Sequence, residues 1–195
     1  NLFFKKKITL NTLSGDLGSG GKNDYNKFIF RNLNLVKSFD LYKTHTNTIK
    51  INLEKNFNLK KYRIKNIVIF NVFEHIFEKE ILLNSISKSL SKNGKLELFV
   101  PFMYKYHGDP NDYYRFTHSY LKKFLEKNGF KVKITLIGAG QFNVILEILF
   151  KYFKLDILKI IISTIFILCN KIFYFTSRDF KNYYCGIHCS CIKIK

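Results

Sequence analysis

Short runs of β-branched and aromatic residues alternate with segments of helical periodicity along most of this chain. The runs typical of strands cover residues 12–17, 35–40, 48–52, 66–72, 95–102, 130–137 and 186–195. Helical spacing of apolar residues occurs in 78–90 and 119–127, and 22–32 is a further candidate helix. Strands that alternate with helices predict right-handed crossovers and a mostly parallel sheet with helices on both faces.

Turn and capping residues support these boundaries. Asn93-Gly94 provides a stop after 78–90, Thr117 is placed to cap the helix 119–127, and Asn128-Gly129 closes it. The chain has 195 residues, of which 47% are hydrophobic, and only two prolines. This is enough to bury one sizeable core, so we predict a single α/β domain over 1–195. Its ligand is expected at the carboxyl ends of the strands.

The interval from about 141 to 175 is strongly apolar and is predicted to be a helical insertion before the last strand. Its uninterrupted run, 160–169, is bounded by Asp156, Lys159 and Asn170, which leaves too few residues for a membrane-spanning helix. Two interpretations remain open. The interval is either a pair of core helices that roof the active site, or an interfacial hairpin whose lysines meet anionic headgroups in a peripheral membrane contact.

The formal charge is +19, from 33 basic and 14 acidic residues. Only four of the basic residues are Arg, whereas phosphate and base recognition favours clustered Arg. We therefore interpret the Lys excess as a compositional bias spread over solvated faces and predict no specific nucleic-acid partner.

The four cysteines lie in the last 27 residues, and no signal-like segment opens the given sequence. Both features favour free thiols and a cytoplasmic setting, with membrane association through 141–175 as the open addition. In the segment 185–191, Cys185, Cys189 and Cys191 alternate with His188 along a predicted strand. Because they point to opposite faces, they cannot share one ion, and no metal site is predicted.

A glycine cluster, Asp16-Leu17-Gly18-Ser19-Gly20-Gly21, follows the first predicted strand. Glycines permit the tight turn and let the backbone approach a ligand closely. Asp40 lies twenty residues beyond Gly20, where an acid can accept hydrogen bonds from both hydroxyls of a ribose. A dinucleotide motif that starts at Gly18 needs a glycine at position 23, where this chain has Asn23.

Several longer strings resemble the class I S-adenosylmethionine (SAM)-dependent methyltransferases. The string at 69–76, I-F-N-V-F-E-H-I, is similar to the family's fourth-strand motif, and L-S-K-N-G-K-L at 90–96 is similar to the turn into the fifth strand. V-P-F at 100–102, followed by H-G-D-P-N-D-Y-Y-R-F-T at 107–117, resembles a methyltransferase type 11/12-like subgroup. The resemblance implies a Rossmann-like three-layer sandwich, whose mostly parallel seven-stranded sheet has an antiparallel terminal strand at 183–195.

The resemblance also implies a set of cofactor-binding residues at the ends of four strands. They are Asp16, Gly18, Ser19 and Gly20 for the methionine part of SAM, Asp40 for the ribose, Leu41 beside the adenine, Asn52 and Leu53 near the adenine amino group, and Asn71 beneath the sulfonium. Two positions depart from the family pattern. Ser14-Gly15 replaces the usual apolar run, and Lys22 stands where a small residue is common.

His107 and His75 are the candidate catalytic bases, because histidine titrates near neutrality and an acceptor that must lose a proton needs a base. The Glu-His pair at 74–75 has the alternative role of positioning the next helix. Substrate-binding candidates are His107, Asp112, Tyr113 and Arg115. An Asp112–Arg115 ion pair that fixes the loop, with Tyr113 merely packing, is the alternative.

Methyl transfer from SAM to a small molecule, glycan or lipid-linked intermediate is the leading functional hypothesis. A catalytically inactive methyltransferase-fold protein, acting as a membrane-associated protein or scaffold, is the main alternative. A polyanion-binding module is a third class.

Overall fold

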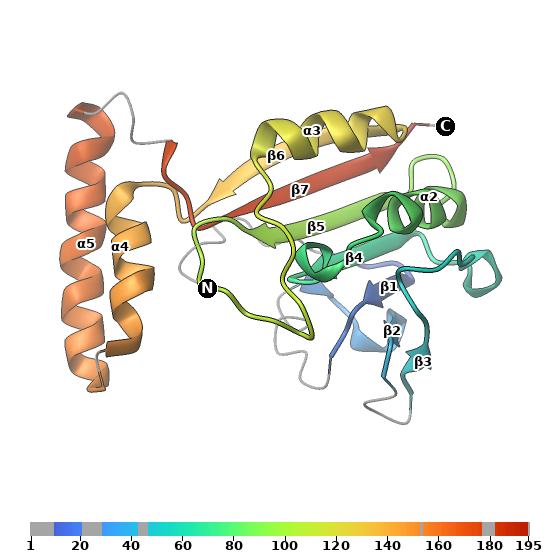
Figure 1. Ribbon diagram of the computed structural model, residues 1–195, viewed down its shortest axis with the longest axis horizontal. Helices are drawn as coiled ribbons and strands as arrows, with labels where there is room; N and C mark the ends of the chain where they lie inside the picture. Colours follow the sequence, from blue (N-terminus) through green and yellow to red (C-terminus); the bar gives the residue numbers. More distant parts are fainter. Residues whose placement is uncertain (1–9, 21–28, 43–46, 153, 177–181, 195) are drawn as a thin grey trace.

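The computed structural model describes residues 10–20, 29–42, 47–152, 154–176 and 182–194 (Figure 1). Seven strands form one sheet in the order β3-β2-β1-β4-β5-β7-β6. They are β1 (Ser14–Leu17), β2 (Val36–Asp40), β3 (Ile49–Lys50), β4 (Asn66–Phe70), β5 (Lys95–Pro101), β6 (Phe130–Ile137) and β7 (Gly186–Lys193). β7 runs antiparallel to both β5 and β6, whereas β1 to β5 pair in parallel. The predicted Rossmann-like sheet is confirmed.

Two helices, α2 (Lys79–Ser89) and α3 (His118–Lys127), pack on the same face of this sheet (Figure 1). The Thr117 hydroxyl accepts a hydrogen bond from the Tyr120 amide at 3.2 Å, so the predicted N-cap is confirmed. Short 3-10 helices occupy Leu33–Leu35, Lys60–Tyr62 and Phe73–His75. Of the candidate helix 22–32, residues 21–28 lie outside the described part of the chain.

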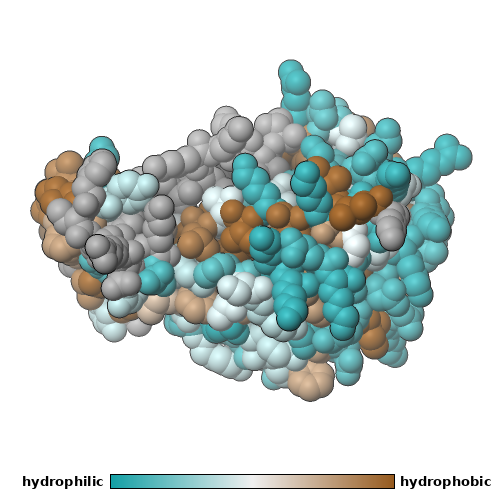
Figure 2. Space-filling view, turned by 90° about the horizontal axis from the view of Figure 1, so that it is seen from above, coloured by the Kyte–Doolittle hydropathy of each residue, from teal (hydrophilic) through white to brown (hydrophobic). Residues whose placement is uncertain are grey.

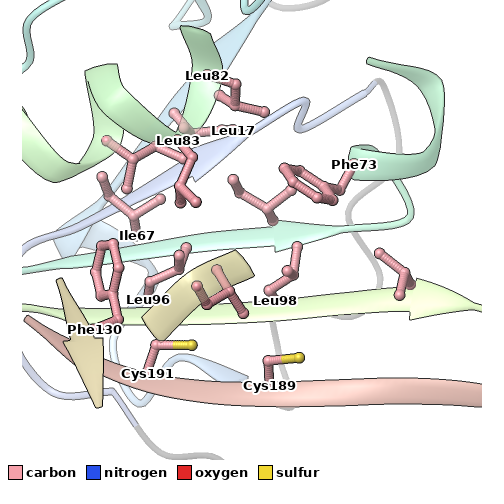
Figure 3. Packing of buried hydrophobic residues seen from close by; sticks show 14 of the residues in the cluster. Leu17, Ile67, Phe73, Leu82, Leu83, Leu96, Leu98, Phe130, Cys189 and Cys191 are labelled. Atoms are coloured by element: carbon pink, nitrogen blue, oxygen red, sulfur yellow. The ribbon is translucent and has the colours of Figure 1, made fainter. Parts of the chain in front are cut away.

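The core lies between the sheet and these helices (Figure 3). All five residues of β4 are buried, as expected for a central strand covered on both faces. Cys189 and Cys191 point into the core, and burial raises the pKa of the Cys189 thiol to about 12. His188 lies on the other face, with its Nε2 atom 2.9 Å from Oε2 of Glu97. The predicted alternation of Cys and His along β7 is therefore confirmed.

The order of the strands reverses between β1 and β4. From β1 the chain continues outward through β2 to β3, and it then returns to add β4 and β5 on the other side. In α/β sheets a crevice opens at the carboxyl ends of the strands that flank such a reversal. The segments that follow β1, β2 and β4 are therefore the place to look for a ligand site.

An antiparallel hairpin of α4 (Gln141–Leu149) and α5 (Asp156–Thr176) projects beside the sheet, on the left in Figure 1. The Phe142 and Phe173 rings pack at 5.0 Å, and the Asn170 side-chain amide donates to Oδ1 of Asn143 at 2.7 Å. These contacts join the two helices to each other. The outer face of α5 stays exposed.

Two predictions about the insertion are wrong: that its apolar run is too short to span a membrane, and that its helices belong to the core. Helix α5 has 21 residues, and Lys159 and Asn170, which were expected to bound the apolar run, lie inside it. Asp156–Tyr174 is long and apolar enough, by length and composition alone, to cross a membrane. It is not a core helix, since only 11% of that window is buried.

Candidate functional site

The glycine loop after β1 is held by main-chain hydrogen bonds to the end of β2. The amides of Gly18 and Ser19 donate to the Phe39 carbonyl at 2.8 and 3.2 Å. The Gly20 amide donates to Oδ2 of Asp40 at 2.8 Å. Gly18 and Gly20 have φ values of +71° and +59°, which residues with a Cβ rarely adopt. The sequence-predicted loop therefore forms, with its predicted acid directly beside it.

Asp40 bridges two segments of the site. Its second oxygen, Oδ1, accepts a hydrogen bond from the Tyr42 amide at 3.1 Å. Because each carboxylate oxygen accepts about two hydrogen bonds, both oxygens keep capacity for hydroxyl donors. Leu41 is 39% exposed, so its side chain is accessible to a ligand.

The turn after β4 closes the other side of the loop. A Cβ added to Gly18 would lie 2.4 Å from Cγ2 of Val72, so the loop backbone packs directly on this turn. Asn71 has a φ of +54°, is exposed, and donates its amide to the Phe99 carbonyl at 3.1 Å. Loop and turn are thus brought together at the reversal of strand order.

The other predicted cofactor-binding residues are buried or already hydrogen-bonded within the chain. Asp16 is fully buried within β1. Asn52 uses its side-chain oxygen to accept the Glu54 amide at 2.9 Å, which forms a local turn after β3. Leu53 is 6% exposed and belongs to the hydrophobic core, so its side chain is not accessible to a ligand.

The departures from the family pattern are partly explained. A Cβ on Gly15 would lie 2.9 Å from Cδ1 of Ile64 and 3.3 Å from the Phe39 ring, so a larger residue there requires Ile64 to shift. The Ser14 hydroxyl donates to the Thr12 carbonyl at 2.7 Å and accepts from the Asn66 amide group at 3.1 Å. Lys22 lies outside the described residues.

Asp112 organises the loop that carries the H-x-x-P-x-D-Y-x-R-F-T string. Its side chain is 1% exposed and accepts hydrogen bonds from both Nη atoms of Arg115, and also from the His107 amide at 3.0 Å. Arg115 also donates to the Lys105 carbonyl at 3.0 Å. The Arg115 guanidinium holds the pKa of the Asp112 carboxyl well below its usual range. The ion pair of the alternative interpretation is therefore present, and it links two residues of the loop.

His75 and His107, the two candidate bases, meet around Glu74. Their ring centroids are 4.9 Å apart, and their Nε2 atoms lie 3.7 and 3.4 Å from Oε1 of Glu74. Glu74 is completely buried, and burial raises its pKa to about 7. Neither of its carboxylate oxygens has a hydrogen-bond partner among the described residues. Sequence reasoning singled out both histidines but gave Glu74 only a structural role.

The substrate candidates line an open pocket of about 240 Å³ beside this cluster. Its walls are Tyr106, Asp112, Tyr113, Tyr114 and Arg115. Tyr113 is 45% exposed and packs edge-on against Phe77 at 5.3 Å, so its ring both packs and faces the opening. Three of the four predicted substrate-binding residues thus share one pocket, whereas His107 is not part of its lining and contacts Asp112 and Glu74.

Neither a family model nor a curated protein sequence matches the chain. Solved structures share its fold at low sequence identity. Phosphoethanolamine N-methyltransferase 2 from Haemonchus contortus, solved with S-adenosyl-L-methionine, aligns over 96% of this chain and 50% of its own, with a TM-score of 0.55 and 12% identity. The chain therefore spans about half the length of that enzyme.

Two further neighbours are similar in size to this chain. A SAM-dependent methyltransferase from Archaeoglobus fulgidus aligns over 96% of this chain and 88% of its own, with a TM-score of 0.58 and 16% identity. One from Mesorhizobium loti aligns over 96% and 93%, with a TM-score of 0.58 and 10% identity. These likenesses show the fold, which is that of the class I methyltransferases.

Proposed function

We propose that this chain is a SAM-dependent methyltransferase whose acceptor is a small molecule, a glycan or a lipid-linked intermediate. The observation that carries the proposal is the Gly18–Asp40–Asn71 arrangement at the reversal of strand order, in a fold shared with SAM-dependent methyltransferases. The residues also fit the cofactor. Among the described residues, nothing would lie within 4 Å of a Cβ on Gly20, and the buried Ser19 hydroxyl has no hydrogen-bond partner.

In this proposal each strand end has its own task. The loop at 18–20 approaches the methionine part of the cofactor, Asp40 accepts hydrogen bonds from the ribose hydroxyls, and Leu41 covers the adenine. Bound SAM supplies a methyl group on a positively charged sulfur. The chain contributes mainly proximity and orientation of the acceptor.

The acceptor is expected to enter from the pocket lined by Tyr113 and Arg115. It then meets the cluster of Glu74, His75 and His107, which lies a few residues beyond Asn71. An acceptor hydroxyl or ammonium group would lose its proton there. The pair of buried Asp112 and partly exposed Arg115 keeps the loop that carries His107 in place.

Calorimetry with SAM and with its demethylated product, S-adenosylhomocysteine, tests the proposal. We expect both to bind with one-to-one stoichiometry, and Asp40→Ala to weaken both, because the ribose loses its carboxylate partner and the Gly20 amide loses its acceptor. Asp156→Ala removes an exposed acid on the distant hairpin and is the matched control. Absence of binding of either compound to the wild-type chain contradicts the proposal.

A catalytically inactive protein with this fold is the alternative function. It is separated from the enzyme by release of S-adenosylhomocysteine in the presence of small-molecule, glycan and lipid-linked acceptor fractions. Release that depends on His107 supports the enzyme. SAM binding without release from any fraction supports the alternative.

The α4–α5 hairpin supports a peripheral membrane contact as part of either function. Brown, hydrophobic side chains gather at the left end of Figure 2, where α5 lies. Its exposed apolar residues include Ile157, Ile160, Ile161, Ile165, Leu168 and Ile172. Lys154, Lys159 and Lys171 accompany them in the sequence and complement an anionic headgroup layer.

We expect the wild-type chain to float with vesicles that contain anionic phospholipid. The double variant Ile157→Asn, Ile160→Asn replaces side chains that are 69% and 66% exposed. It is expected to bind vesicles at least about tenfold more weakly, because two apolar side chains no longer enter the acyl boundary. Leu33→Asn, which is 49% exposed elsewhere, is the control. If no wild-type protein floats, the membrane proposal is wrong, and a concentration-dependent dimer would assign the same face to a second copy.

A further inference from the structure

The side chains of Glu74, His75 and His107 converge more closely than an acid–base pair requires. One ligand atom from each of the three residues lies within 4.8 Å of the other two. Oε1 of Glu74 lies 3.4 Å from Nε2 of His107 and 3.7 Å from Nε2 of His75. Ligands about 2.1 Å from a tetrahedral ion are about 3.4 Å apart, so these two separations are already close to the spacing of metal ligands.

The hydrogen bonds around the cluster orient both histidines toward Glu74. Nδ1 of His75 lies 2.5 Å from the Asn111 carbonyl oxygen, which can only accept. Nδ1 of His107 lies 3.1 Å from Oδ2 of Asp112 and 3.3 Å from the Lys105 carbonyl oxygen, both acceptors. Nδ1 therefore carries the proton in each ring, and a neutral ring presents the lone pair of Nε2 toward Glu74.

When both rings are neutral and Glu74 is ionised, the centre of the cluster is rich in acceptors and short of donors. Two imidazole lone pairs and a buried carboxylate face one another, and the carboxylate oxygens have no hydrogen-bond partner in the described part of the chain. A buried carboxylate in this state is costly unless it is paired or coordinates a metal ion.

We propose that Glu74, His75 and His107 form a binding site for a divalent transition-metal ion. Two imidazole nitrogens and one carboxylate oxygen suit Mn²⁺, Fe²⁺, Co²⁺ or Zn²⁺ better than Mg²⁺ or Ca²⁺, which prefer oxygen ligands only. The Nδ1 partners, Asn111 and Asp112, match the outer shell that usually orients metal-binding histidines. Three protein ligands leave at least one coordination position for another molecule.

The site deepens the proposed function, on which its role in methyl transfer rests. A metal ion beside the acceptor pocket would bind an acceptor through oxygen atoms and lower the pKa of a coordinated hydroxyl. His75 and His107 would then act through the ion and not as free bases. An acceptor with a hydroxyl, carboxylate or phosphate oxygen next to the methylated atom fits this arrangement best.

Metal uptake is tested on the full chain without a histidine tag, after chelator treatment and in the absence of SAM. Co²⁺ is followed by its visible absorption, in which thiolate ligation by the four cysteines would appear as a separate charge-transfer band. Mn²⁺, which thiols bind poorly, is followed by electron paramagnetic resonance. We expect one equivalent of each ion to bind without thiolate absorption.

The variants Glu74→Gln and His107→Ala are expected to weaken the affinity for both ions by more than about 100-fold. Loss of a residue that only orients a ligand typically costs about 10–100-fold. His118→Ala is the matched control, since His118 is exposed and its ring contacts Tyr184 instead. Glu74→Gln keeps the size of the side chain, and circular dichroism checks that it folds. No uptake of Co²⁺ or Mn²⁺ by the wild type, or equal uptake by Glu74→Gln, overturns the proposal.

A SAM titration of the same preparations separates the two proposals. Metal uptake without SAM binding keeps the metal site and contradicts the methyltransferase function. SAM binding without metal uptake keeps the methyltransferase function and contradicts the metal site. Glu74 is then a buried, protonated partner of His107.

Discussion

Gly18→Ala is expected to weaken SAM binding by about 100-fold or more, which corresponds to about 2.7 kcal/mol. Gly18 has a φ of +71°, where an alanine is strained by about 1–2 kcal/mol. The new Cβ would also lie 2.4 Å from Cγ2 and 2.7 Å from Cγ1 of Val72. Neither atom can give way freely, because Val72 follows the turn at Asn71 and the loop amides are bonded to Phe39. The loop must move, and its cofactor contacts move with it.

Gly129→Ala is the matched control for Gly18→Ala. Gly129 also has a positive φ, +84°, but an added Cβ would meet only the flexible end of Lys193, at 3.3 Å, far from the loop. Both variants are compared by calorimetry with SAM and by thermal unfolding. We expect both to lose stability and only Gly18→Ala to lose the cofactor. Unchanged SAM affinity in Gly18→Ala would remove the loop at 18–20 from the binding site.

Asp112→Asn is expected to lower the free energy of unfolding by about 3 kcal/mol, because it weakens several hydrogen bonds in which the donor or the acceptor is charged. The Asp112 side chain is 1% exposed, whereas the Arg115 side chain is 27% exposed, so water replaces the lost interaction only on the Arg115 side. Asparagine keeps the shape but offers one acceptor oxygen in place of two, so part of the contacts to Arg115 and the His107 amide is lost. For a chain of this size, about 3 kcal/mol lowers the melting temperature by about 9 °C.

Asp109→Asn provides the control, since Asp109 lies in the same loop but is exposed. Urea unfolding followed by circular dichroism measures both variants at neutral pH. We expect Asp109→Asn to stay within about 0.5 kcal/mol of the wild type, as exposed substitutions usually do. A similar small effect for Asp112→Asn would show that the ion pair with Arg115 does not hold the loop.

Much of the fold follows from local sequence patterns. The apolar runs at 36–40, 66–70 and 130–137 are strands, and the Thr117 cap begins a helix, as predicted. The glycine loop and Asp40 were also found, because the tight turn and the acid after the next strand leave a signal within about twenty residues. Such features depend on periodicity and on turn chemistry, which short stretches of sequence carry.

Composition alone does not determine whether the apolar insertion is buried or exposed. The pattern of 141–175 predicted helices but gave no indication whether their apolar faces would be covered. In the structure α4 covers one side of α5 through Phe142 and Asn143, and the outer face stays exposed. Burial depends on which other segments approach, so a local pattern does not determine it.

The sequence by itself determined the strands, the glycine loop and the pair of histidines. Only the tertiary structure decided that Glu74 lies buried between His75 and His107, with its oxygens unpartnered in the described chain. The reason is physical. His107 is 33 residues from Glu74, and the loop that carries it is tied to Glu74 by the Tyr113 and Tyr114 amides, which donate to the Glu74 carbonyl at 2.9 and 3.3 Å. Contacts over such separations depend on the packing of the whole domain, which no local spacing encodes.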